Sequence, residues 1–204
     1  QKNLLVSRRT PGIEDLQTRC ETGDKGMMLI EQAPFGVIGS ITPSTNPTST
    51  VCYKAMIALK SGNAIVFSPH PKAIACTRKA AQIVSEAAQA AGAPADAVAC
   101  LSIPSLDGCQ ELMKAEPVRL ILATGGPGMV KAAYSSGTPA IGVGPGNCNV
   151  VIDETADLRM AVESIIHSKT FDNGMICASE QHITVLASVY DEVKRLLKLS
   201  LIHI

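Results

Sequence analysis

Residues 118–128 read Val-Arg-Leu-Ile-Leu-Ala-Thr-Gly-Gly-Pro-Gly, and this stretch decides the fold. The apolar run 118–123 has the length and composition of a buried strand. The glycine-rich turn 124–128 follows directly and opens a helix that we expect to reach about residue 135. A strand, a short turn and a helix in this order form the unit from which parallel α/β sheets are built.

The same order repeats on both sides of this unit. Asn46 before Pro47 is a typical helix start. Residues 1–26 are polar and predict no regular element. The alternation with short loops predicts an α/β fold, a mostly parallel sheet with helices on both faces. The other strands are predicted at 27–32, 36–42, 64–67, 98–103, 140–143, 149–152 and 182–186, and the other helices at 47–60, 72–91, 106–114 and 158–169.

Composition limits the classes of function. Of 204 residues, 46% are hydrophobic and 18% charged, so one α/β domain, or one and a half smaller ones, can bury a sizeable core. Lys plus Arg and Asp plus Glu number 18 each, which argues against nucleic acid as a partner because phosphate binding needs clustered excess cation. Aromatic residues make up only 3%, which argues against base-stacking platforms.

The seven cysteines indicate a reducing compartment. Their number is odd, no pair has the C-x-x-C spacing, and most lie in apolar runs. Four scattered histidines argue against a zinc site, and no apolar stretch approaches the length of about 18 residues that a membrane span needs. We therefore expect a cytoplasmic chain with no metal and no membrane partner.

The two ends of the chain predict a fragment of a longer protein. Residue 1 is Gln and not Met, and residues 199–204, Leu-Ser-Leu-Ile-His-Ile, match the translation of a common sequencing-adapter end. We therefore interpret 199–204 as a non-native tail. Resequencing the source gene tests this, and genomic codons for these six residues would contradict it.

Two polar positions follow predicted strands, where open α/β sheets bind ligands. The turn 124–128 suits a phosphate, because glycine lets backbone N–H groups at a helix start approach it closely. A tight turn without a ligand explains the same pattern. Asn46 could donate to an oxyanion or could simply cap its helix, and the sequence leaves both readings open.

Cys177 differs from the other six cysteines in its surroundings. It lies in the polar, glycine-containing break 169–181, between a helix-like and a β-like run, where a thiol is both positioned and reachable. The alternative is one more buried small hydrophobe. His70, in a Pro-His-Pro loop, either contacts a cofactor or is solvated.

Five long motifs carry a resemblance to a known family. They are APFGVIGSITPSTNPTST (33–50), KSGNAIVFSPHPKA (60–73), LILATGGPGMVKAAYSSGTPAIGVGPGN (120–147), VVIDETADL (150–158) and SKTFDNGMICASEQ (168–181). Over about residues 11–198 the chain resembles the CoA-acylating branch of the aldehyde dehydrogenase superfamily. The resemblance implies a Rossmann-like NAD-binding domain in 1–152 and the start of a catalytic domain in 153–198.

The resemblance also implies a reaction, the oxidation of a short-chain aldehyde with NAD and CoA to acyl-CoA and NADH. Cys177 attacks the aldehyde, hydride passes to NAD, and free CoA takes the acyl group from the thioester. Asn46 and the backbone N–H of Cys177 form the oxyanion hole. NAD is expected rather than NADP, and its implied contacts are Thr42, Pro43, Ser68, Pro69, His70, Thr124, Gly125, Gly126, Val143 and Gly144.

One absence separates this branch from hydrolytic relatives. Those relatives carry a glutamate base in the segment that corresponds to about 138–146, whereas no Asp or Glu occurs between Lys131 and Ile152. Hydrolytic relatives also have a ribose-binding lysine where this chain has Ser68. Without a base that activates water, the thioester persists until a thiol attacks, so we expect thiolysis instead of hydrolysis.

The family's complete unit is considerably longer than 204 residues. This chain alone is therefore expected to be inactive, with at most weak nucleotide affinity. The complete protein is expected to be a homo-oligomer that oxidises acetaldehyde reversibly, in the cytoplasm or inside a bacterial microcompartment. Two alternatives remain, another aldehyde such as succinate semialdehyde and a truncated nucleotide-binding or assembly module without catalysis.

Overall fold

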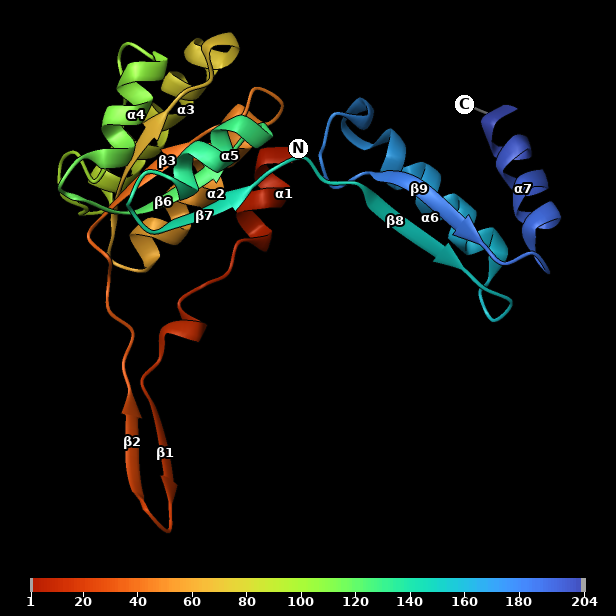
Figure 1. Cartoon of the computed structure of the whole chain (residues 1–204), viewed down its shortest axis with the longest axis horizontal. Coiled ribbons are helices and arrows are strands. Elements are labelled where there is room, and N and C mark those ends of the chain that lie inside the picture. The colour runs from red at the N-terminus through yellow and green to blue at the C-terminus, as the bar shows by residue number, and fades with distance from the viewer. Residues whose placement is uncertain (1, 203–204) are drawn as a thin grey trace. The chain divides into compact units, whose positions relative to one another are not determined.

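The computed structural model describes residues 2–202, and the chain divides into two compact units, Gln1–Gly144 and Pro145–Ile204. Figure 1 labels most helices and strands of both units. The first unit contains α1 (Lys2–Arg9), η1 (Glu14–Leu16), β1 (Arg19–Gly23), β2 (Gly26–Ile30), β3 (Val37–Ile41), α2 (Pro47–Lys60), β4 (Ala64–Ser68), η2 (Pro71–Ala73), α3 (Ile74–Ala90), β5 (Val98–Cys100), α4 (Leu106–Lys114), β6 (Val118–Thr124), α5 (Pro127–Tyr134) and β7 (Ala140–Val143). The second contains β8 (Cys148–Ile152), α6 (Leu158–Thr170), η3 (Phe171–Gly174), β9 (Glu180–Val185) and α7 (Tyr190–Ile202).

A five-stranded parallel sheet with the order β5-β4-β3-β6-β7 forms the centre of the first unit. The chain starts in the middle at β3, moves through β4 to the edge strand β5, and then returns to β6 on the other side of β3. The prediction of a parallel α/β sheet is confirmed. The direction of winding reverses between β3 and β6, and open α/β sheets bind ligands at the carboxyl ends of the strands beside such a reversal.

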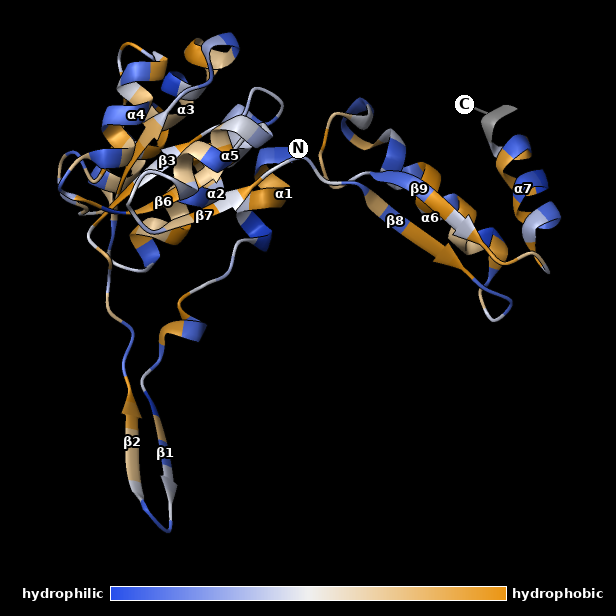
Figure 2. Ribbon diagram, in the orientation of Figure 1, coloured by the Kyte–Doolittle hydropathy of each residue, from blue (hydrophilic) through white to orange (hydrophobic). Residues whose placement is uncertain are grey.

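Helices cover both faces of this sheet. One core cluster joins α2 and α3 to the sheet through Val51, Ala81 and Phe67, and the other joins α4 and α5 through Met113 and Ala133. Leu120 belongs to the first cluster and its neighbour Ile121 to the second, as the alternation of side chains along a strand requires. Figure 2 shows the sheet strands mainly in hydrophobic colours and the helices with hydrophilic turns on their outer sides.

The first 30 residues are more regular than their composition predicts. Residues 2–9 form α1, which packs against α2. Strands β1 and β2 form an antiparallel hairpin that pairs Arg19 with Ile30, and nearly all of its residues are exposed. The strand predicted at 27–32 corresponds to β2, whereas α1 and β1 were not predicted, because they depend on contacts with α2 and β2 that the polar composition of residues 1–26 does not reveal.

The second unit has its own sheet and core. Strands β8 and β9 pair in parallel, and α6 and α7 pack around Ile152, Val162, Ile165 and Val193. The predicted domain boundary after residue 152 differs from this division because β8 pairs with β9 and not with the five-stranded sheet.

The end of helix α7 overlaps the predicted non-native tail 199–204. Helix α7 continues to Ile202, and residues 203–204 of the predicted tail 199–204 lie outside the described residues. Among the helices in residues 2–202, none has the length and apolar character to cross a membrane.

Candidate active site

The predicted site residues of the first unit gather at one edge of its sheet. Because the strands are parallel, their carboxyl ends meet at the same edge, and each predicted contact lies at or just after such an end. The residues are Thr42, Pro43 and Asn46 after β3, Ser68, Pro69 and His70 at the end of β4, Thr124, Gly125 and Gly126 at the end of β6, and Val143 and Gly144 at the end of β7.

Thr42 and Ser68 are bonded to each other. The backbone N–H and the hydroxyl of Thr42 both donate to the carbonyl oxygen of Ser68, at 3.1 and 3.2 Å, and both side chains are buried. These two residues therefore join the ends of β3 and β4. His70 is half-buried, and its Nδ1 accepts from the backbone N–H of Lys72 at 3.1 Å at the start of η2.

Asn46 occupies the N-cap position of α2, but its side chain accepts no capping hydrogen bond from the helix. Its Oδ1 accepts from the Nζ of Lys2, and its Nδ2 donates to the hydroxyl of the neighbouring Thr45 at 3.2 Å. The simple capping alternative therefore does not describe this side chain. Its amide donor is occupied only by a local bond at the carboxyl edge, where a ligand oxygen can compete for it.

The glycine-rich turn offers backbone donors at specific positions. The N–H of Gly125 donates to the carbonyl of Val143 at 3.1 Å, so this donor belongs to the contact with β7. Gly126 is the N-cap of α5, and an added Cβ at Gly126 or Gly128 would meet nothing within 4 Å. N–H groups in the first turn of a helix lack intrahelical partners, so Gly126 and Gly128, and not Gly125, present donors to an anion.

Lys54 is a further charged residue at this edge that the sequence did not single out. It is 3% exposed, and its Nζ donates to the carbonyl oxygens of Ile41 and Leu122 and to the hydroxyl of Thr124, at 3.3, 2.9 and 3.0 Å. Burial lowers the pKa of this ammonium to about 7. The available signal was its spacing, because Lys54 lies three residues after Val51 and four before Ala58 on the buried stripe of α2.

Cys177 lies in the second unit, and its side chain is exposed. The alternative of a buried small hydrophobe therefore does not hold for this cysteine, whereas it fits Cys109, whose pKa is raised by burial. The chain reaches Cys177 through Asp172, Asn173 and Gly174, which all have positive φ and form a tight left-handed turn.

Backbone contacts position the loop around the thiol. The carbonyl of Cys177 accepts from the Sγ of Cys148 at 3.7 Å, and within residues 2–202 no hydrogen bond uses the Cys177 N–H. Ser179 is buried, its hydroxyl accepts from the Nζ of Lys169 at 3.5 Å, and its N–H donates to Ile176. The loop is thus tied to α6 on one side while the thiol and the N–H of Cys177 remain available.

In the segment without carboxylates, Gly142 has no room for a side chain. A Cβ on Gly142 would lie 2.6 Å from Val130 Cγ1 and 2.9 Å from Tyr134 Cε2, and the N–H of Gly142 donates to the Tyr134 hydroxyl at 2.9 Å. Helix α5 therefore packs directly on the backbone of β7 in the middle of the segment 138–146.

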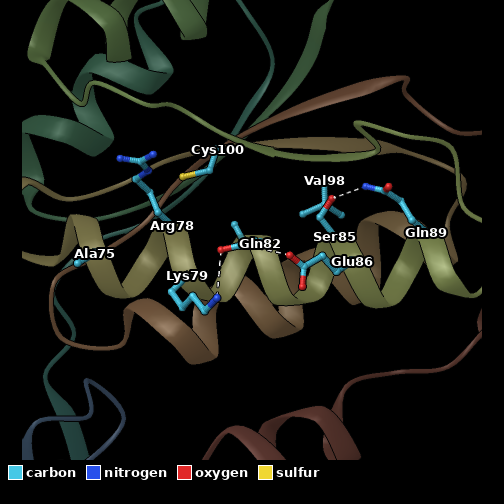
Figure 3. Close-up of a pocket in the computed structure, with 10 residues that line it drawn as sticks. Ala75, Arg78, Lys79, Gln82, Ser85, Glu86, Gln89, Val98 and Cys100 are labelled. Atoms are coloured by element: carbon cyan, nitrogen blue, oxygen red, sulfur yellow. Dashed lines mark hydrogen bonds between the residues drawn. The ribbon is translucent and has the colours of Figure 1, made fainter.

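A cavity of about 570 Å³ lies elsewhere, between α3 and the edge strand β5. Figure 3 shows Arg78 of α3 beside Cys100, and Lys79 of the same helix hydrogen-bonded to Gln82. None of the predicted site residues lines this cavity, so it is separate from the carboxyl edge described above.

Residues 9–201 match the aldehyde dehydrogenase family. Bifunctional aldehyde-alcohol dehydrogenase AdhE of Escherichia coli (strain K12) is 61% identical over 161 residues, which are 79% of this chain and 18% of that protein. Acetaldehyde dehydrogenase (acetylating) EutE of the same organism is 41% identical over 198 residues, 97% of this chain and 42% of EutE. The chain thus spans less than half the length of these relatives.

Solved structures show the same relationship. A propionaldehyde dehydrogenase from the fucose utilisation bacterial microcompartment of Clostridium phytofermentans has a TM-score of 0.90 at 42% identity, covering 97% of this chain and 45% of that one. The Rhodopseudomonas palustris propionaldehyde dehydrogenase with bound CoA and an acylated cysteine gives the same four values. An engineered glycolyl-CoA reductase with bound NADP+ has a TM-score of 0.89 at 42% identity, with coverages of 97% and 45%.

Proposed function

The chain belongs to the aldehyde dehydrogenase family, in its CoA-acylating branch, and from this premise we propose that it supplies the nucleophile and a cofactor-binding sheet for converting a short-chain aldehyde, NAD and CoA to acyl-CoA and NADH. The observation that carries the proposal is the exposed Cys177, held in an ordered loop with its backbone N–H unused among residues 2–202. Acetaldehyde is the proposed substrate, since EutE is named for it.

The proposal assigns Cys177 as the attacking group. Its thiolate adds to the aldehyde carbon, and the carbonyl π electrons move to oxygen, where the Cys177 N–H and the Asn46 amide donate to the resulting oxyanion. NAD supplies the acceptor for the hydride that leaves this carbon. The thioester then remains on Cys177 until the thiolate of CoA attacks its carbonyl, and the Cys177 thiolate departs as the acyl group transfers.

Thiolysis in place of hydrolysis is part of the proposal. Activation of water needs a general base, and the segment from Lys131 to Ile152 contains no carboxylate. The close approach of Val130 and Tyr134 to Gly142 supports this reading at that one position, because a side chain on residue 142 would displace α5.

The two units receive different roles in the proposal. The first binds NAD at the carboxyl edge of its sheet, with Gly126 and Gly128 donating N–H groups to phosphate at the start of α5. The second begins the catalytic domain and presents Cys177. We also infer that the complete protein is a homo-oligomer and acts in the cytoplasm or in a microcompartment, the source of one structural relative.

A chimera tests the activity. We would replace the matched segment of E. coli EutE with this chain and measure NADH formation from acetaldehyde, NAD and CoA. The expected result is CoA-dependent turnover that Cys177→Ala abolishes and Cys20→Ala, at another exposed cysteine, leaves intact. A folded chimera that oxidises acetaldehyde to acetate equally fast without CoA would contradict thiolysis.

The 204-residue chain by itself is proposed to be inactive. Its match covers 42% of EutE, so a purified 204-residue chain lacks counterparts for the other residues of EutE. Absorbance at 340 nm with acetaldehyde, CoA and NAD measures this directly. NADH production by the purified chain would refute the proposal.

A further inference from the structure

The reversal point between β3 and β6 holds a buried cation whose three partners are neutral. Lys54 comes from α2 and reaches the ends of both central strands. Its Nζ donates to the carbonyl of Ile41, the last residue of β3, to the carbonyl of Leu122 in β6, and to the hydroxyl of Thr124, the last residue of β6. An ammonium has three N–H donors, so these three acceptors use all of them.

Burying the ammonium of Lys54 has an unfavourable desolvation free energy, which an apolar side chain at this position would avoid. The Lys54 side chain is 3% exposed, and burial alone accounts for the lowering of its pKa to about 7. A methionine would fill a similar volume without the desolvation cost of an ammonium. The lysine therefore contributes something other than core packing to this position.

The contact with Thr124 connects Lys54 to the glycine-rich turn. Thr124 is followed by Gly125, whose N–H is held by the Val143 carbonyl of β7 at 3.1 Å. The turn is thus fixed from two sides, by Lys54 through the Thr124 hydroxyl and by β7 through Gly125. The next residue, Gly126, starts α5, and its carbonyl accepts from the N–H groups of Met129 and Val130 at 3.0 and 3.1 Å. The orientation of this first turn therefore follows from that of the Thr124–Gly126 turn.

We propose that Lys54 is a positioning residue of the nucleotide site, which clips the ends of β3 and β6 together and fixes the Thr124–Gly126 turn so that the N–H groups at the start of α5 meet a diphosphate. The proposal deepens the NAD-binding role given above and rests on it for the identity of the ligand. The Nζ of Lys54 lies 3.0 Å from the hydroxyl of Thr124, the first residue of the turn, so its positive charge in the protonated state adds to the attraction for an anion there.

The test uses the 204-residue chain, with ADP as the diphosphate probe. Lys54→Met is expected to keep or raise the melting temperature, because it removes a buried ammonium without a carboxylate partner. The same variant is expected to speed amide hydrogen exchange at residues 124–128 and to weaken ADP binding, both about tenfold, a loss of about 1.4 kcal/mol. A role in packing alone would lower the melting temperature without a selective change at the turn.

A second variant asks whether Lys54 acts through the hydroxyl. Thr124→Val removes one acceptor and keeps the shape of the side chain, and it is expected to reproduce part of the effect on exchange and ADP binding. If Lys54 works through Thr124, the double variant binds ADP no worse than Lys54→Met, so the two effects are not additive. Full additivity would contradict the coupling. The matched control is Lys60→Met on the same helix, whose Nζ contacts the Pro11 carbonyl.

The outcomes separate this inference from the proposed function. If the unmodified chain binds ADP and Lys54→Met binds it equally well with unchanged exchange at 124–128, the positioning role is wrong and the nucleotide site stands. If the unmodified chain binds no ADP, the nucleotide site is contradicted, and exchange at 124–128 still decides whether Lys54 fixes the turn.

Discussion

Lys54 makes the stability of the chain depend on pH in a predictable direction. Its pKa in the folded chain is about 7 against 10.5 for an ordinary lysine, so between these values the unfolded state binds more protons than the folded state. Stability therefore rises with pH from about 7, by up to about 1.4 kcal/mol per pH unit. Urea unfolding at several pH values between neutrality and the range where thiols ionise measures this slope.

Lys54→Met provides the control for that slope. The variant lacks the titrating group, so the difference in unfolding free energy between the two chains should grow smaller as the pH increases above neutrality. Burial raises the pKa of Cys52, Cys100 and Cys109 above 9.0, which works in the opposite direction at higher pH in both chains. A pH-independent difference would show that Lys54 titrates normally.

Gly142 and Gly128 predict opposite responses to the same substitution. Gly142→Ala places a Cβ 2.6 Å from Val130 and 2.9 Å from Tyr134, so we expect a loss of about 1–3 kcal/mol in the free energy of unfolding. Gly128→Ala adds a methyl group in open space inside α5 and is expected to be neutral or to stabilise by up to about 1 kcal/mol. Chemical denaturation compares them, and equal losses would contradict the close packing of α5 on β7.

The sequence predicted residues whose surroundings are local better than those whose role depends on distant contacts. Cys177 stood in a polar break, and the structure leaves it exposed. Lys54 was missed because a lysine in a helix normally indicates a solvated face, and its acceptors lie on β3 and β6. The bond between Thr42 and Ser68 was equally invisible, since it joins residues that only the sheet brings together.

The N-cap residues of α6 and α2 allow a role in helix capping to be distinguished from the proposed role in catalysis. The carboxylate of Asp157 accepts from the Met160 N–H at 3.0 Å and caps α6, so Asp157→Ala is expected to cost about 1 kcal/mol of stability. Asn46 makes no such bond, so Asn46→Ala is expected to cost less than half as much while reducing turnover of the EutE chimera at least tenfold. Thermal unfolding and NADH formation measure the two effects. A large stability loss for Asn46→Ala with unchanged turnover would restore the capping reading.

Elements with a strong apolar period were predicted closely, and those at edges were not. Helix α2 begins at Pro47 and ends at Lys60 as expected, because the Asn-Pro start and the Ser-Gly stop are both local signals. The strand expected at 98–103 ends at Cys100, since β5 is an edge strand that pairs with β4 over three residues only. Hairpin β1–β2 lacks a buried face, so β1 gave no alternating pattern to detect.

At the scale of the whole molecule, the two compact units have separate hydrophobic clusters, which predicts a separate response of each unit to core substitutions. Ile152→Ala is expected to lower the stability of the second unit by about 2–5 kcal/mol and to speed hydrogen exchange in β8, α6 and α7. Ile121→Ala is expected to do the same in β3, β6 and α5. Hydrogen exchange read by peptide mass spectrometry measures both, and a uniform change over all helices and strands would contradict two cooperative units.

The unit boundary shows where prediction from sequence reached its limit for the whole chain. The parallel α/β class followed from the order of apolar runs, which the sequence displays directly. The assignment of β8 to a sheet did not follow, because Cys148–Ile152 has the same apolar character as the strands before it. Pairing partners are set by long-range contacts, and β9 lies 28 residues beyond the end of β8 in the numbering.

The order of the strands along the chain also determines which unit can fold first during translation. All five strands of the central sheet lie between Val37 and Val143, so every residue of that sheet has been added before Pro145. Ribosomes add roughly 5–20 residues per second, and domains generally fold as units from the N-terminus. The first unit therefore has seconds to fold while the second is still being translated. Cys177, the proposed nucleophile, is added after every strand of the sheet with which it is proposed to work.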